Sequence, residues 1–243
     1  MAKFEIRDGV AIIPEGTTEI GIMAFKDCTS LKSVEMPKGV AEIDFGAFYD
    51  CTSLESITIP ETITSIGPLT FAGCTSLKSI IIPKSATMIH GLTFSGCTLL
   101  ESITIPESVT KIGERAFSNC ISLKNINIPE SVTEIGFGAF SGCTSLESIS
   151  IPKAVAWIGS ETFENCSSLD SITIPESVTY IGSEAFKGCT SLKSITLSES
   201  VEEINEYAFN DCSALTAIYV PAGKADYYKE VLPEKLHDKI VEL

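Results

Sequence analysis

The sequence predicts a repeat solenoid of the α/β class in which β-structure dominates. Nine cysteines recur at a constant spacing of 23 residues, a phenylalanine stands three positions before each, and a leucine stands three positions after each. One such unit cannot bury its own apolar side, so successive units must stack on one another. The period therefore predicts about ten coils of 23 residues each. The cysteines are Cys28, Cys51, Cys74, Cys97, Cys120, Cys143, Cys166, Cys189 and Cys212.

Each unit begins with a strand that ends at a proline. The stretch from Leu146 to Pro152 has the alternation of apolar and polar residues that is typical of a strand with one buried face. Proline cannot donate a ladder hydrogen bond, so the chain leaves the sheet there. The next residues, such as Val132 to Gly136, return across the opposite side, and the A-F-x-x-C segment predicts one helical or 3₁₀ turn. We therefore expect a parallel sheet on one side and short helical turns on the other.

The two ends depart from the repeat, as the ends of a solenoid must if they are to hide the terminal ladders. Residues 1–14 read as a hairpin cap around the Asp8-Gly9 turn. The solenoid, this cap included, is expected over 1–223. Residues 224–243 form a C-terminal cap of the same domain, with a helix from Ala225 to Leu232 and a closing strand after Pro233.

The repeat resembles a known family. Its consensus, L-x-x-I-x-I-P followed by V-x-x-I-G-x-x-A-F-x-x-C, is similar to the BspA-like leucine-rich repeats of bacterial surface proteins, and the match covers about residues 5–223. The resemblance implies a right-handed leucine-rich-repeat solenoid that is used for adhesion or protein binding. It implies no catalytic residue.

Composition argues against several classes of function. The net charge is -15, from 17 basic and 32 acidic residues, which disfavours nucleic acid and anionic membranes. No apolar run approaches the length of a membrane span. Only two histidines are present, and no nucleophile elbow, zinc-protease motif, phosphate loop or calcium loop occurs. We expect no enzyme, no metal and no cofactor.

The cysteine column admits three chemistries, namely disulfide bonds, metal binding and buried thiols. No C-x-x-C motif occurs, an odd number of cysteines cannot pair completely, and stacked side chains point the same way. We favour a structural ladder of reduced thiols that act as small apolar groups.

Two other columns of equivalent positions in the repeat lead to structural predictions. The column of Gly67, Gly113 and Gly136 also contains His90, and residues that tolerate a positive φ would suit a turn there. His90 is therefore interpreted as a turn residue. The column after the leucine alternates in sign, as in Lys32, Glu55 and onward, which predicts ion pairs between coils that set the register.

Subtracting the repeat leaves a few large apolar residues at positions that packing does not dictate. They fall into a group in the first coils and a group on three later coils. Two interpretations of these side chains are open. They fold over the turns or pack under a cap, or they contact a protein partner or a second copy of the chain. The candidate binding residues are Phe45, Leu69, Met88 and Leu92 in the first group, and Phe137, Trp157 and Tyr180 in the second.

These observations favour a non-catalytic protein-binding or adhesion module. The alternatives are a purely structural spacer, or an engineered, consensus-like scaffold without a specific partner. The expected partner is a host matrix or surface protein, or a second copy. The resemblance implies an extracellular or cell-surface location, although residues 1–6 lack the apolar stretch of an export signal, and a cytoplasmic location is the alternative.

Overall fold

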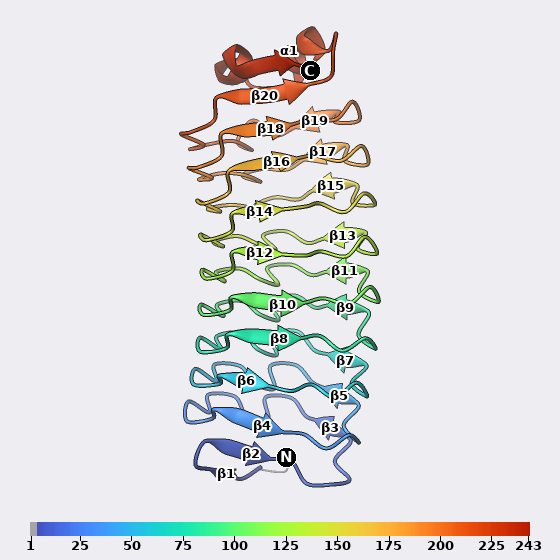
Figure 1. The fold of residues 1–243 in the computed structure, drawn as a ribbon, viewed down its shortest axis with the longest axis vertical. Coiled ribbons are helices and arrows are strands. Elements are labelled where there is room, and N and C mark those ends of the chain that lie inside the picture. The colour runs from blue at the N-terminus through green and yellow to red at the C-terminus, as the bar shows by residue number, and fades with distance from the viewer. Residues whose placement is uncertain (1–3) are drawn as a thin grey trace.

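A computed structural model describes residues 4–243 as a stack of coils that runs the length of the molecule from the N-terminal to the C-terminal end (Figure 1). Each coil contributes two short strands, one to each of two walls, and a third wall is made of turns. The apolar residues of all coils meet in one continuous core. The prediction of a β-dominated repeat solenoid of about ten coils is confirmed.

The first wall is built from the segments before the prolines, where the sequence predicts strands. Neighbouring strands are parallel, and in the repeat their register partners are 23 residues apart, as in Ser171 and Ser194. Serines and threonines face outward and isoleucines face the core. The strands are β4 (Ser33–Glu35), β6 (Ser56–Ile57), β8 (Ser79–Ile81), β10 (Ser102–Thr104), β12 (Asn125–Ile126), β14 (Ser148–Ile149), β16 (Ser171–Thr173), β18 (Ser194–Thr196) and β20 (Ala217–Val220).

The second wall is also a parallel sheet, whereas the sequence predicted only a returning segment there. Its strands fall into sheets of three, β3-β5-β7, β9-β11-β13 and β15-β17-β19. The second residue of each strand is a buried isoleucine, and the first points outward. The strands are β3 (Glu19–Ile20), β5 (Glu42–Ile43), β7 (Ser65–Ile66), β9 (Met88–Ile89), β11 (Lys111–Ile112), β13 (Glu134–Ile135), β15 (Trp157–Ile158), β17 (Tyr180–Ile181) and β19 (Glu203–Ile204).

Stacked turns form the third wall, where the sequence predicts one helical or 3₁₀ turn in each coil, and each turn has a bond of the 3₁₀ type between its cysteine and its phenylalanine. The N–H of Phe48 donates to the carbonyl of Thr70 on the next coil at 2.9 Å, whereas the N–H of Cys51 donates to Phe48 within its own turn at 3.1 Å. Bonds between coils thus alternate with bonds inside the turn, so no continuous helix forms. The residue before each cysteine lies in the left-handed region and is always Asp, Asn or Gly, the types that adopt it most easily.

Both ends are capped within the described residues. At the N-terminal end, β1 (Ile6–Arg7) pairs antiparallel with β2 (Val10–Ile12), which begins the first wall. At the other end, α1 (Ala225–Val231) and the 3₁₀ helix η1 (Glu234–Lys239) cover the last coil, and β21 (Ile240–Glu242) pairs with β20. Tyr228 of α1 is fully buried, and its hydroxyl donates to the carbonyl of Ser198.

The phenylalanines make a single aromatic column through the core. From Phe4 to Phe209, successive rings stack with centroids 5.2 to 5.7 Å apart and interplanar angles of at most 16°. Offset stacked rings attract one another beyond the burial of their surface. The column therefore links every coil to its neighbours.

The glycine column is explained by close approach, which corrects the turn interpretation. Gly67, Gly113 and Gly136 do not have positive φ values. Instead, a Cβ at Gly136 would come within 2.5 Å of the backbone nitrogen of Glu114 in the preceding coil. At Gly136 the lack of a side chain therefore lets the two backbones come into contact, although His90 shows that the column also accepts a side chain.

This contact predicts that substitutions at two glycines of the same column lower the free energy of unfolding by different amounts. We expect Gly136→Ala to lower the free energy of unfolding by about 3 kcal/mol, because neither backbone can move away without disturbing the stack. Gly21→Ala should stay within about 1 kcal/mol of the wild type, since no atom lies within 4 Å of its Cβ position. Urea unfolding of both variants measures the difference, and equal destabilisation would contradict the account.

Candidate functional site

No group of three or more His, Cys, Asp or Glu side chains within residues 4–243 could hold a metal ion. His90 is half-buried, and burial lowers its pKa. His237 contacts the carbonyl of Leu232 at 3.0 Å, inside the C-terminal cap. No helix between residues 4 and 243 has the length and apolar character needed to span a bilayer.

The cysteine column is a set of hydrogen-bond donors as well as apolar groups. From Cys51 to Cys212, each Sγ lies 3.0 to 3.2 Å from the carbonyl oxygen of the phenylalanine 26 residues earlier, on the preceding coil. That oxygen also accepts the N–H of the cysteine in its own turn, as Phe71 does from Cys74. The thiols thus tie each turn to the next.

Burial disfavours the thiolate form of the cysteines from Cys51 to Cys212. It raises the pKa of Cys51, Cys97, Cys143 and Cys212 to about 12, against an ordinary value near 8.5. A raised pKa and lack of solvent access are the opposite of what a reactive cysteine needs. These thiols therefore stay protonated near neutral pH.

The outward side of the first wall consists mostly of small polar side chains. A shallow open hollow of about 800 Å³ lies over β14 and β16, and small hydroxyl side chains such as Ser148, Ser171 and Thr173 line it. The bulky exceptions are Ile12 and Ile81, which are 61% and 66% exposed, and Tyr219 of β20. Such a surface offers few large contacts to a partner.

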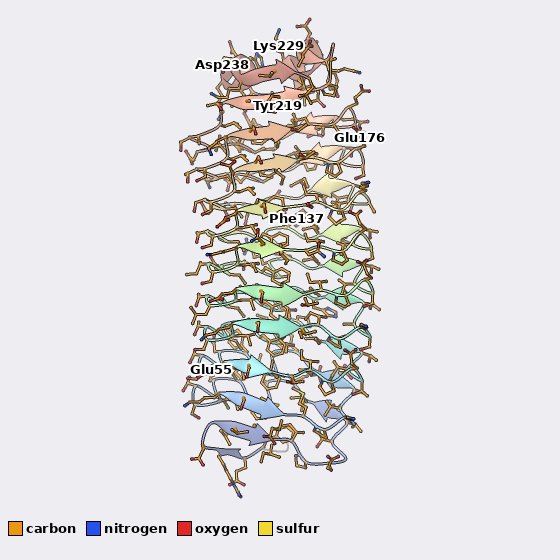
Figure 2. All side chains as sticks on the ribbon, viewed as in Figure 1. Glu55, Phe137, Glu176, Tyr219, Lys229 and Asp238 are labelled. Carbon is orange, nitrogen blue, oxygen red and sulfur yellow. The ribbon has the colours of Figure 1, made fainter. Side chains whose placement is uncertain are left out.

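In the second group of candidate residues, Trp157 and Tyr180 lie side by side on the second wall, and Phe137 lies in the turn that follows β13. Trp157 of β15 and Tyr180 of β17 are register partners on adjacent strands, so their side chains project side by side from the sheet. Trp157 is 39% exposed and Phe137 is 57% exposed, whereas Tyr180 is half-buried. Phe137 lies at about mid-height of the stack (Figure 2).

Phe137 also packs between coils. Its ring lies against Gly159, where an added Cβ would come within 2.6 Å of Phe137 Cδ1. Gly159 is two residues beyond Trp157, so the two aromatic side chains belong to one region of the surface. At this junction β13 and β15 are not paired, and Trp157 therefore lies on the edge strand of its sheet. We call Phe137, Trp157 and Tyr180 the aromatic group.

The first group of candidates is more dispersed. Leu69 and Leu92 occupy equivalent turn positions on adjacent coils, each with φ of +59°, and both are half-buried. Met88 is half-buried on β9 of the second wall. Phe45 is 37% exposed and lies two coils from Leu92. These side chains come from the turn wall and from the second sheet.

The predicted column of ion pairs between coils forms at one place among the described residues, between Lys193 and Asp170. The remaining pairs between coils lie elsewhere. Lys111 pairs with Glu134 at 2.7 Å across the second wall, and Arg115 reaches Glu161 two coils away at 2.8 Å. The expected ladder is therefore wrong as a general feature.

Some of the exposed large side chains were not identified from the sequence. Tyr207 is 49% exposed, in a turn column otherwise occupied by residues such as Gly138 and Glu184. Leu99 and Ile121 are 44% and 43% exposed at positions where Ser and Thr are usual. Subtracting the repeat from these columns would have found all three.

The 23-residue coil with two short strands and a stacked turn defines a repeat scaffold of the leucine-rich type. The family described as the BspA type leucine rich repeat region matches residues 10–124 and 110–231 in six copies. The chain belongs to this family.

Solved structures share the fold. A leucine-rich repeat protein of T. pallidum is 32% identical over 78% of this chain and 86% of that one, with a TM-score of 0.61. The pneumococcal vaccine antigen PcpA is 18% identical over 97% and 79% of the chains, with a TM-score of 0.54. A leucine-rich repeat protein of Eubacterium ventriosum is 19% identical over 84% and 83%, with a TM-score of 0.50. The comparison with curated proteins gives no match.

The buried thiols predict a steep loss of stability at alkaline pH. An unfolded thiol ionises near pH 8.5, whereas a folded one such as Cys97 ionises near 12, so between these values the unfolded chain binds fewer protons. The stabilisation is complete below about pH 8.5 and falls by about 1.4 kcal/mol per pH unit for each buried cysteine as the pH rises. Urea unfolding at a series of pH values measures the slope.

The matched control replaces Cys97, Cys120 and Cys143 by serine, whose hydroxyl does not titrate in this range and can still donate a hydrogen bond. We expect the free energy of unfolding of this variant to fall less steeply above pH 9. Equal slopes for the variant and the wild type would show that the thiols are not the cause.

Proposed function

We propose that this chain is a non-catalytic protein-binding module of the adhesion type, and that the aromatic group is its contact surface. The observation that carries the proposal is the side-by-side placement of Trp157 and Tyr180 on adjacent strands, with Phe137 nearby and more than half exposed. Aromatic residues are enriched at the cores of protein interfaces, because they give a large contact area for little loss of side-chain entropy.

The scaffold supports such a role because it is rigid. Backbone bonds join the turns of neighbouring coils, and the stacked phenylalanines run the whole length of the core. Outward residues are thereby held in place before a partner arrives, which lowers the entropy cost of binding. Membership of the BspA-type family supports a location at the cell surface, where such a partner is a matrix or surface protein.

The proposal is tested by the double variant Phe137→Ala/Trp157→Ala. We expect its binding to purified matrix and bacterial-surface proteins to fall by about tenfold or more against the wild type, since aromatic anchors dominate interface energies. The free energy of unfolding should fall by less than about 2 kcal/mol, because both rings are already partly in water. Surface capture and urea unfolding measure the two quantities.

The matched control is Ile81→Ala/Leu99→Ala, which removes exposed apolar side chains from other parts of the surface. This control should bind as the wild type does. A structural spacer predicts no saturable partner, and an aromatic variant that binds as well as the wild type would contradict the proposal.

A further inference from the structure

We propose that the partner presents a cationic segment, rich in arginine and lysine, to a composite surface. This surface is made of the aromatic group, of Glu203 beside Tyr180, and of Glu202 and Glu206 in the same coil as Glu203. This inference rests on the proposed function and names the chemistry of the partner.

The register brings aromatic rings and a carboxylate into one row. Trp157 pairs with Tyr180, and Tyr180 pairs with Glu203, so the three first residues of β15, β17 and β19 are consecutive neighbours on the outward face. Adjacent strands are about 4.8 Å apart, so a single extended side chain can contact two members of this row.

Three carboxylates of the coil that contains β19 have no ion-pair partner among residues 4–243. Glu202, Glu203 and Glu206 are exposed, and no lysine, arginine or histidine of residues 4–243 forms an ion pair with them. Some other acidic residues form ion pairs within the chain. Glu134 is bound by Lys111, and Glu184 is bound by Lys187 at 2.9 Å. The negative charge next to Tyr180 therefore remains available to a ligand.

The two kinds of side chain favour the same ligand. A guanidinium or ammonium group is attracted to the face of Trp or Tyr, and an adjacent carboxylate adds a charge-assisted hydrogen bond. Arginine suits both contacts, because its planar group stacks and donates at once. A second copy of this chain is a poor occupant, since each copy carries a net charge of -15.

Trp157 is the only tryptophan of the chain, so its fluorescence reports directly on this surface. The probes are a short synthetic peptide of alternating arginine and serine, the same peptide with glutamate for arginine, and an uncharged peptide of leucine and serine. We expect a saturable change of Trp157 fluorescence with the arginine peptide alone, and a weaker affinity as salt is raised. Equal responses to the three peptides, or none to the arginine peptide, would overturn the inference.

The variant Glu203→Gln/Glu206→Gln removes two charges while it keeps the shape of the side chains. We expect it to weaken binding of the arginine peptide about fivefold. The matched control is Glu19→Gln/Glu42→Gln, which removes the same charge from the same outward row at the N-terminal end. This control should bind as the wild type does, and equal losses in both variants would show that only the net charge matters.

The two proposals fail in different ways. If Phe137→Ala/Trp157→Ala abolishes binding of a matrix or surface protein while Glu203→Gln/Glu206→Gln leaves it unchanged, the proposed function stands and the cationic partner is wrong. If the aromatic variant has no effect on any partner, both are wrong. Concentration-dependent sedimentation that the aromatic variant abolishes would identify a second copy as the occupant and overturn the cationic partner.

Discussion

The structure depends on one constraint, namely that a 23-residue coil cannot bury its apolar side except against another coil. The phenylalanine column is the clearest result, since eight of its rings, from Phe25 to Phe186, are almost entirely removed from water only because a ring lies above and below. Tight stacking in turn requires glycine where backbones touch and donors for the carbonyls of the turns. The cysteine thiols donate to these carbonyls, and the caps cover the first and last coils.

The constraint also determines where function can lie. Positions that face the core or the next coil are restricted to a few residue types, and the first wall is restricted to small hydroxyl residues over most of its length. The outward row of the second wall has no such restriction. It contains Glu19, Met88, Lys111, Trp157 and Tyr180 at equivalent places. Aromatic and acidic side chains there change the surface without disturbing the fold.

Much of this was predictable from the sequence, and the failures have physical causes. The period predicts the coil count and the register, and the departures near Asp8-Gly9 and Pro233 predict both caps. The second sheet and the turn wall depend on hydrogen bonds between coils, which a local pattern does not contain. Gly136 was misread because its neighbour is a backbone 22 residues away. Trp157 and Tyr180 are exceptions to the repeat, but the row of Trp157, Tyr180 and Glu203 is recognised only from the strand register.

We propose that the partner binds at the second wall. Hydroxyl-radical footprinting of the chain with and without a bound partner locates the contact, because oxidation reports the solvent access of each aromatic side chain. We expect Trp157, Tyr180 and Phe137 to become protected while Tyr219, on the first wall, is oxidised as before. Protection of Tyr219 with no change at Trp157 would contradict it.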